Sequence, residues 1–247
     1  MREKLEDVTH GKTAPADAAR GIVALASPTP AAHLWRCDLT PIAKQVQARR
    51  AMLSSAELER AARFGSPLLR ERYILGRGAL RTILGCVLDV APDAVPIVRG
   101  RRGRPQLAQP EGPDFNLSNT ASVAFVGVCS TGRIGVDIER CDRSVNVAGI
   151  ARKFLAESER DALASLSVDA ARRDVLALWT AKEAMSKATG DALAAPFAQI
   201  AVDVRTMRVR AGPGAYAPHR WVLHRVDAGP DYFATIALWQ PDASAGP

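Results

Sequence analysis

The amino-acid sequence predicts an α+β fold of two similar lobes, each a small antiparallel sheet packed with a long helix, related by pseudo-twofold symmetry. Three observations lead to this prediction. Two long stretches read as helices, one opened by an N-terminal cap and the other stopped by a glycine, and short runs of β-branched and aromatic residues between turns are typical of strands. The second half of the chain then repeats the order of the first, helices followed by strands, which indicates two lobes.

We divide the chain into four parts. Residues 1–30 are rich in Ala, Pro and Thr without clear periodicity and are interpreted as a flexible N-terminal extension. An N-terminal α+β lobe is expected at 31–132, a C-terminal α+β lobe at 133–240 and a flexible tail at 241–247. Ordered structure is expected to begin with a strand near His33.

The first lobe is expected to contain two helices and a set of strands. A capping box at residues 54–57 opens a helix through Phe64, and Ser66 with Pro67 provides a cap and an N1 proline for a second helix to about Leu88. The arginines of this second helix fall off its apolar stripe, so one face packs and the other can meet anions. Strands are expected at 95–98, 114–117, 123–128 and 134–139, with the last two forming an antiparallel hairpin.

The second lobe follows the same plan. A helix is expected around 153–155, and a longer helix runs from about Asp169 to Ala188, where Gly190 stops it. The expected strands lie near 200–204, 221–226 and 232–238.

Composition restricts the function. The 247 residues are 47% hydrophobic, enough to bury a core, and no apolar run approaches the roughly 18 residues of a membrane span. The N-terminus shows no export signal, so we expect a cytoplasmic protein with no membrane partner, and a monomer. The four cysteines form no C-x-x-C pair and the four histidines lie apart from every dense motif, which disfavours redox, thiolate-metal and Ser-His chemistry.

Positive charge is concentrated in one stretch. Between Arg49 and Arg104 there are twelve arginines, no lysines and five acidic residues, so this stretch alone accounts for a charge equal to the net +7 of the chain. Arginine binds phosphate and carboxylate bidentately, which points to an anionic partner: nucleic acid, a phosphorylated cofactor or an acidic protein. A solvated helix face is the ordinary alternative.

Two carboxylates lie together on the predicted strand 134–139. Asp137 and Glu139 are two positions apart and therefore point to the same face, beneath Gly135, which leaves room for a close approach. Two adjacent carboxylates need a divalent cation or basic neighbours, and oxygen ligands without His or Cys favour Mg²⁺. A solvent-exposed strand end without a metal site could have the same residue pattern.

Glu183 and Lys187 are i,i+4 neighbours on the long C-terminal helix. An exposed salt bridge is the commoner reason for this spacing. Near a carboxylate pair, however, Glu183 could complete a metal site and Lys187 could neutralise phosphate charge.

Two polar segments of the first lobe add donors. The run 115–120 follows a strand and offers hydroxyl, amide and backbone donors suited to phosphate, although a simple turn has the same composition. The turn 99–104 has two glycines and four arginines and could bind phosphate or nucleic acid.

These segments, in this order, resemble the 4′-phosphopantetheinyl transferase superfamily, in particular its larger pseudo-dimeric, surfactin-synthetase-activating type, over roughly residues 55–200. The matching motifs are Arg60-x-x-Arg63-Phe64, Gly103-Arg104-Pro105 (where Lys is common in the middle), Phe115-Asn116-Leu117-Ser118-Asn119, Gly135-Val136-Asp137-Ile138-Glu139 and Trp179-Thr180-x-Lys182-Glu183-Ala184-x-x-Lys187-Ala188-x-Gly190.

The resemblance implies an enzyme of the holo-[acyl-carrier-protein] synthase type. It would transfer the 4′-phosphopantetheine group of coenzyme A to a serine of an apo acyl or peptidyl carrier protein, or carrier domain, and release adenosine 3′,5′-bisphosphate. It also implies that Mg²⁺ is held by Asp137, Glu139 and Glu183, and that Glu183 and Lys187 are catalytic. The residues implied to bind coenzyme A are Arg60, Arg99, Gly103, Arg104, Pro105, Asn116, Ser118, Asn119, Asp137, Glu183 and Lys187.

Two features of this scheme stay open. The serine proton is expected to pass to Glu183 or to a metal-bound water activated by it. Asn119 stands where the family usually has His, so we expect coenzyme A binding to depend more on the arginines and less on pH between 6 and 8.

Two other functions fit parts of the sequence. A nucleic-acid-binding protein would use the arginine excess, but the sequence lacks aromatic stacking platforms and recognised reading motifs, so nucleic acid is a disfavoured partner. A non-catalytic binder of coenzyme A or a carrier protein would not need the intact set of polar residues at 137, 139, 183 and 187.

Overall fold

A computed structural model describes residues 21–240, so most of the extension and all of the tail that we predicted lie outside the described residues. The described chain consists of helices and small antiparallel sheets, which confirms the α+β prediction. The helices longer than one turn are α2 (Ala43–Arg50), α3 (Ser55–Ala62), α4 (Pro67–Leu88), α5 (Val147–Phe154), α6 (Glu157–Ala164) and α7 (Val168–Thr189). The strands are β1 (Ile22–Leu25), β2 (Ala32–Asp38), β3 (Ile97–Arg99), β4 (Pro105–Leu107), β5 (Asp114–Thr120), β6 (Val123–Cys129), β7 (Arg133–Arg140), β8 (Ala201–Asp203), β9 (Arg208–Ala211), β10 (Trp221–Val226) and β11 (Tyr232–Trp239).

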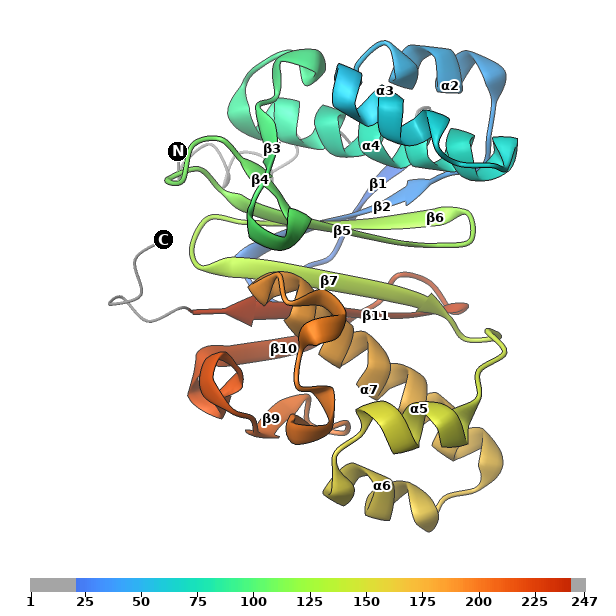
Figure 1. Ribbon diagram of the computed structural model, residues 1–247, viewed down its shortest axis with the longest axis vertical. Coiled ribbons are helices and arrows are strands. Elements are labelled where there is room, and N and C mark those ends of the chain that lie inside the picture. Colours follow the sequence, from blue (N-terminus) through green and yellow to red (C-terminus); the bar gives the residue numbers. More distant parts are fainter. Residues whose placement is uncertain (1–20, 241–247) are drawn as a thin grey trace.

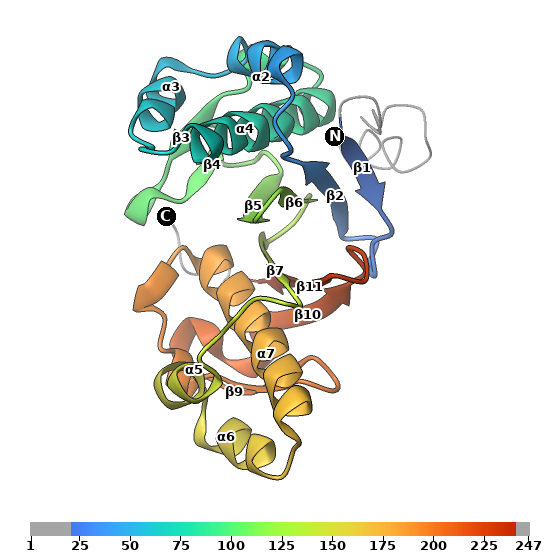
Figure 2. The same cartoon turned by 90° about the vertical axis from the view of Figure 1, so that its right-hand side faces the viewer.

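The elements form four layers (Figure 1). Helices α2, α3 and α4 cover the outer face of a four-stranded sheet of order β1-β2-β6-β5, and α7, with α5 and α6 beside it, covers the outer face of a three-stranded sheet of order β10-β11-β7. The turned view shows α4 and α7 on opposite sides of the two sheets (Figure 2). Three apolar cores result: one under α4, one under α7 and one between the sheets.

The two long helices begin and end close to the predicted residues. Ser54 closes a capping box with Glu57 at the start of α3, and Ser66 caps α4. In the second lobe, α7 ends at Gly190, whose φ of 83° is the left-handed conformation that a glycine adopts without strain. The helices α2 and α6 and the strands β4 and β9 were not predicted.

Strand β1 shows that ordered structure begins earlier than His33. Its residue Ile22 is fully buried and lies opposite Cys37 of β2 in an antiparallel pair. The prediction was wrong here because only one of the four β1 residues is buried, too few for a recognisable alternation.

The predicted hairpin of β6 and β7 does not form. Strand β6 pairs with β2 and β5, whereas β7 pairs with β11 in the other sheet. Both strands have an apolar face, and stacking the sheets buries both faces at once. A Cβ on Gly127 of β6 would lie 2.6 Å from Val136 of β7, so a glycine is needed for this close stacking.

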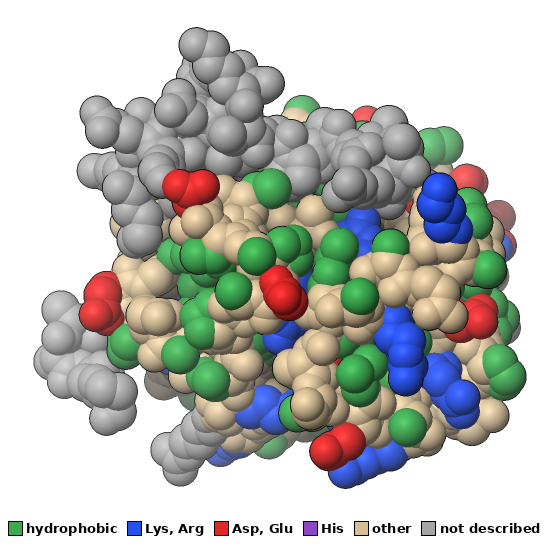
Figure 3. Space-filling view, turned by 90° about the horizontal axis from the view of Figure 1, so that it is seen from above, with side chains coloured by type: hydrophobic (Ala, Val, Ile, Leu, Met, Phe, Trp, Pro, Cys, Tyr) green, Lys and Arg blue, Asp and Glu red, His purple; other side chains and the backbone are tan. Residues whose placement is uncertain are grey.

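The arginines of α4 are less available to anions than predicted. Arg77 and Arg81 both bind the carboxylate of Glu57, each at 2.6 Å, and Arg81 is 2% exposed. This correction arises because α3 packs against α4 and brings Glu57 over the polar side of the longer helix. On the face above these helices, where it is not covered by grey atoms, Lys and Arg side chains are interspersed with acidic and apolar ones rather than gathered into one patch (Figure 3).

The strands of the first sheet lie between Ile22 and Cys129 and those of the second between Arg133 and Trp239. We keep a division into lobes at residue 132 as a proposal on this basis, and the pseudo-twofold relation stays a prediction. Among residues 21–240, no helix is both long enough and apolar enough to cross a membrane.

Candidate active site

The site lies where the edge strands of the two sheets meet. Strands β5 and β7 belong to different sheets, and alternate side chains of β5 bridge to β7 in place of a backbone ladder. The contacts are Asp114 to Ile134 N (2.8 Å), Asn116 to Val136 N (3.1 Å), Ser118 to Asp137 (2.7 Å) and Thr120 to Glu139 (3.0 Å). The polar run that we expected to follow a strand is therefore part of β5, where its side chains join the two lobes.

Gly135 allows α7 to lie directly on β7. Alternate residues of β7 are packed between the sheets, which leaves Gly135, Asp137 and Glu139 on the face toward α7. A Cβ on Gly135 would lie 1.8 Å from the carbonyl oxygen of Ala184, so any other residue would push the helix away. This contact brings Glu183 and Lys187, which flank Ala184 on the helix, to the carboxylates of β7.

Lys187 forms the centre of the site together with the buried side chains of Asp137 and Ser118. The Nζ atom of Lys187 lies 2.5 Å from Asp137 Oδ1 and 2.8 Å from Ser118 Oγ. Asp137 is 5% exposed, and its second oxygen, Oδ2, is buried without a hydrogen-bond partner. An orphaned carboxylate oxygen is costly in a protein interior and is expected mainly where a ligand completes it.

Glu139 and Glu183 surround Asp137 with further negative charge. Burial raises the pKa of Glu183; Lys187 opposes this shift, and the carboxylates of Asp137 and Glu139 add to it. Burial also raises the pKa of Glu139, with Arg143 opposing and Asp137 adding to the shift. Three carboxylates thus interact around Lys187, and two of them hold their protons more tightly than usual.

The three carboxylates fit a divalent cation by their chemistry. Oxygen donors without His or Cys are those that Mg²⁺ prefers, and the orphaned Oδ2 of Asp137 has a lone pair to offer. Within residues 21–240, no three His, Cys, Asp or Glu side chains are already gathered closely enough to hold a metal ion. Binding would therefore require these carboxylates to turn toward one another.

Asn119 lines an open cavity next to the carboxylates. The cavity has a volume of about 520 Å³ and is formed by the ends of β5 and β7, with Glu139 and Arg143 among its lining residues. Asn119 is exposed there, so its amide is accessible to a ligand. Its role in binding coenzyme A stays a prediction.

Arg104 and Asn116 are engaged inside the protein, and their roles in binding coenzyme A stay predictions. The guanidinium of Arg104 binds Asp114 bidentately at 2.7 and 2.8 Å and donates to the Lys187 and Ile134 carbonyls. The Asn116 carbonyl oxygen accepts a backbone N–H of β7. The partners of Arg104 and Asn116 are brought together by packing between distant segments, so the sequence motifs around these two residues do not predict them.

The remaining residues implied to bind coenzyme A lie around the β3–β4 hairpin. Arg60, on α3, and Arg99, on β3, are both exposed. Burial raises the pKa of Tyr73, and the charges of the two arginines partly oppose this shift, so both charges lie near the Tyr73 phenol. Gly103 is at the hairpin turn with a φ of 79°, and Pro105 begins β4. Among the described contacts, none joins Arg60 or Arg99 to the carboxylate cluster.

Sequence reasoning missed two residues close to the predicted ones. Arg143 forms an ion pair with Glu139 across the turn that follows β7, and the sequence gives no local signal for it. Lys182 is completely buried, 2.6 Å from Glu159 and also bonded to the carbonyls of Phe154 and Phe197. Lys182 thus points away from the site that its neighbour Glu183 joins.

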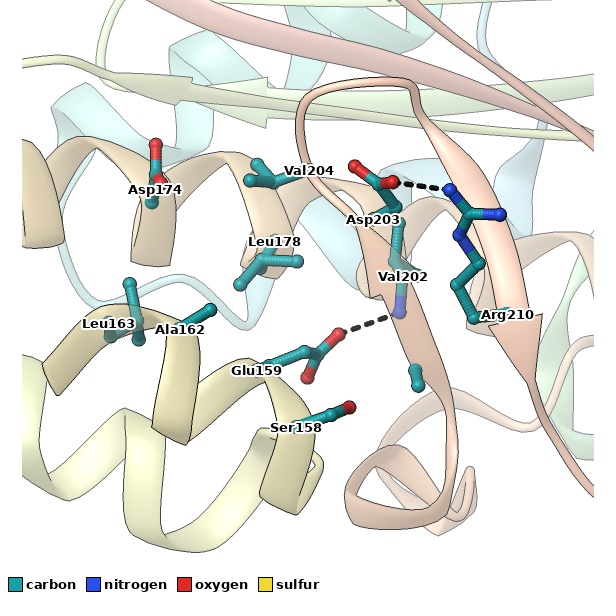
Figure 4. A pocket seen from close by; sticks show the side chains of 11 residues that line it. Ser158, Glu159, Ala162, Leu163, Asp174, Leu178, Val202, Asp203, Val204 and Arg210 are labelled. Carbon is teal, nitrogen blue, oxygen red and sulfur yellow. Dashed lines mark hydrogen bonds and ion pairs between the residues drawn. The ribbon is translucent and has the colours of Figure 1, made fainter. Parts of the chain in front are cut away.

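A second cavity, of about 260 Å³, lies between α6, α7, β8 and β9 (Figure 4). Two of its acidic groups are engaged: Glu159 accepts the Val202 N–H at 2.8 Å, and Asp203 binds Arg210 at 2.6 Å. Separate elements form the two cavities, and this one contains none of the predicted site residues.

The family model and a known relative that match this chain belong to the same superfamily. The family model of the 4′-phosphopantetheinyl transferase superfamily matches residues 133–237. The 4′-phosphopantetheinyl transferase HetI of Nostoc is 39% identical over 165 residues, which cover 66% of this chain and 70% of that protein.

Two further relatives agree. A putative 4′-phosphopantetheinyl transferase of Synechocystis is 30% identical over 197 residues, or 78% of this chain and 79% of the relative. The 4′-phosphopantetheinyl transferase psf-1 of Bacillus pumilus is 26% identical over 147 residues, or 60% of this chain and 62% of the relative.

Proposed function

This chain belongs to the 4′-phosphopantetheinyl transferase superfamily, and from that premise we propose that the cluster of Asp137, Glu139, Glu183 and Lys187 is its reaction centre. The protein transfers the 4′-phosphopantetheine group of coenzyme A to a carrier protein. The observation that best supports this centre is the buried Asp137, which has Lys187 on one oxygen and no partner on the other.

Asp137, Glu139 and Glu183 would hold Mg²⁺. A bound Mg²⁺ supplies positive charge that offsets the charge of the pyrophosphate oxygens of coenzyme A. Lys187 lies beside Asp137 and would contribute a second positive charge, fixed in position by its hydrogen bonds to Asp137 and Ser118.

The transfer itself forms one bond and breaks one. The carrier serine oxygen attacks the phosphorus attached to pantetheine, and the bond from that phosphorus to the bridging oxygen of the pyrophosphate breaks, which releases adenosine 3′,5′-bisphosphate. The serine proton passes to a carboxylate oxygen of Glu183, which lies on α7 one turn before Lys187.

The finer assignments extend this proposal. We take the substrate to be an acyl or peptidyl carrier protein, as for a holo-[acyl-carrier-protein] synthase. The active form would be a monomer, since one chain supplies Ser118 from the first sheet and Asp137 and Lys187 from the second lobe. A cytoplasmic location fits an enzyme that consumes coenzyme A.

The intact mass of the carrier tests the function. Apo acyl and apo peptidyl carrier proteins are incubated with the enzyme, coenzyme A and Mg²⁺. We expect a gain of one phosphopantetheine group on at least one carrier, its loss with EDTA and its return with excess Mg²⁺. If no carrier gains mass, the transferase assignment is wrong; if EDTA has no effect, the metal assignment is wrong.

A further inference from the structure

Arg104 ties together the three elements that carry the reaction centre. Its Nε donates to the Lys187 carbonyl of α7 at 2.8 Å, and its two terminal nitrogens bind Asp114 of β5 and the Ile134 carbonyl of β7, the latter at 2.9 Å. A further contact reaches the Phe115 carbonyl at 3.3 Å. A guanidinium has five N–H donors, and these contacts engage both terminal nitrogens and Nε.

The same three elements meet a second time in the reaction centre. There β5 contributes Ser118, β7 contributes Asp137 and α7 contributes Lys187. The two junctions share Lys187, whose backbone carbonyl is held by Arg104 and whose side chain reaches Asp137. A shift of the last turn of α7 would therefore move the Lys187 amine away from Asp137.

A second arginine of the same turn reaches the end of α7. Arg102 forms an ion pair with Asp191, which follows α7, and the other oxygen of Asp191 accepts the Tyr216 hydroxyl at 2.9 Å. Positive side chains at the C-terminal end of a helix also interact favourably with its exposed carbonyls. We call Arg102 and Arg104 the hairpin clamp, because both extend from the β3–β4 hairpin of the first lobe to the helix of the second.

We propose that Arg104 is a positioning residue, which holds the last turn of α7 so that Lys187 stays beside Asp137, and that its guanidinium does not bind the phosphates of coenzyme A. Two observations support this: Arg104 is only 9% exposed, and its donors are already committed to protein acceptors. The kinetic part of this inference rests on the proposed function, whereas the structural part does not.

Arg104→Lys tests the inference because it keeps the charge and removes the planar fork. A single ammonium cannot bind Asp114 bidentately and also reach the Lys187 carbonyl. The matched control is Arg210→Lys, which alters an ion pair in the distant β8–β9 hairpin. Asp114→Asn, which weakens the clamp from its other partner, is the second variant in case Arg104→Lys does not fold.

The first measurement is hydrogen exchange of the full-length protein without substrates. In Arg104→Lys, or in Asp114→Asn, the amides of Gly190 and Asp191, which bond to Ser186, should exchange at least about tenfold faster than in wild type and in Arg210→Lys. Unchanged exchange there in a folded clamp variant overturns the inference, whether or not the protein proves to be a transferase.

The second measurement is steady-state kinetics with coenzyme A and with 3′-dephospho-coenzyme A. Displacement of a catalytic group by about 1 Å can cost up to ~100-fold, so kcat should fall roughly 10- to 100-fold while KM for both substrates stays within about twofold. A rise in KM for coenzyme A alone, with kcat unchanged, would make Arg104 a phosphate ligand and overturn the inference while leaving the proposed function intact. An inactive wild type contradicts the proposed function, and the exchange result then decides the inference.

Discussion

Each lobe places a charged cluster beside its 22-residue helix, and the two clusters are balanced differently. In the first lobe, Glu57 faces Arg77 and Arg81, and both of its oxygens are bonded. In the second lobe, Asp137 pairs with the partly buried Lys187 and Glu139 pairs with the exposed Arg143, while Asp137 retains an oxygen without a partner. Similar architecture thus supports a closed cluster that fixes helix packing and an open one that has charge left for a ligand.

The two clusters differ in how they affect the free energy of folding as well as in how many of their oxygens have partners. A buried charge with its partners satisfied adds specificity to packing, but an unsatisfied carboxylate beside two others is unfavourable for folding alone. Such strain is expected at a functional site, where a ligand relieves it. The comparison therefore predicts opposite consequences for substitutions in the two clusters.

Glu183→Gln should have the largest effect on activity. It removes the proposed proton acceptor and one metal ligand, so the transfer rate should fall on the order of 10²- to 10³-fold. The melting temperature should stay the same or rise slightly, because the change removes one of three mutually repelling carboxylates. Rates from carrier mass spectrometry and thermal unfolding of the same sample measure both quantities. Wild-type transfer by this variant would remove Glu183 from the reaction centre.

Glu57→Gln should show the reverse pattern. Glu57 is 7% exposed, and its neutralisation leaves Arg81 buried without a counter-charge. Breaking a buried ion pair costs about 3–5 kcal/mol, and in a chain of this size each kcal/mol lowers the melting temperature by roughly 2–4 °C. The folded fraction should keep its kcat.

Glu59→Gln, on the exposed side of the same helix, is the matched control and should melt like wild type. If Glu57→Gln loses kcat without losing stability, the first cluster is not merely structural and the comparison fails.

The pH dependence of stability should differ in sign between the clusters. Burial alone would raise the pKa of Glu57, but Arg77 together with hydrogen bonds from Ser54 and Arg81 brings it below the ordinary value of 4.5. The unfolded state then binds more protons, so Glu57 stabilises the protein above about pH 4.5 and this stability is lost as pH falls through the lowered pKa. For Glu183 the pKa is raised, the folded state binds more protons, and stability falls as pH rises from 4.5 through that pKa.

Melting curves in EDTA between about pH 3 and pH 7 test this sign, because the pKa of Glu57 lies below its ordinary value of 4.5 and that of Glu183 lies above it. At pH 7, Glu57→Gln should melt below wild type and Glu183→Gln at or above it, and both differences should shrink toward about pH 3. Differences of the same sign at pH 7 would contradict the contrast between the clusters.

The sequence predicts the parts of this comparison that depend on local spacing. Caps and apolar periodicity place α4 and α7, and the i,i+2 and i,i+4 spacings, with Gly135, bring Asp137 and Lys187 together. Helix α2 escapes prediction because Ile42 provides no side-chain cap and few of its residues are buried. The partners of Arg104 escape for another reason: Lys187 is 83 positions away, and no local pattern reports such a contact.

Substitutions of Asn119 should have the smallest effect on activity. They test whether the cavity beside the carboxylate cluster binds coenzyme A. Asn119 is exposed in the cavity beside Glu139 and has no charge, so wild-type KM for coenzyme A should not change between pH 6 and 8 through this side chain. In Asn119→His the imidazole titrates near about 6.5. Its positive charge at pH 6 should lower KM relative to pH 8, and an exposed ion pair of about 0.2–1 kcal/mol corresponds to a change of a few-fold at most.

Asn119→Gln is the matched control, because it keeps a neutral amide and should retain the wild-type pH profile. Asn119→Ala removes the donor and should weaken coenzyme A binding at every pH. If Asn119→Ala binds coenzyme A as tightly as wild type and Asn119→His shows no pH dependence, position 119 does not meet the phosphates. The cavity beside Glu139 would then belong to the carrier or the pantetheine arm, and the phosphates would have to lie toward the exposed Arg60 and Arg99.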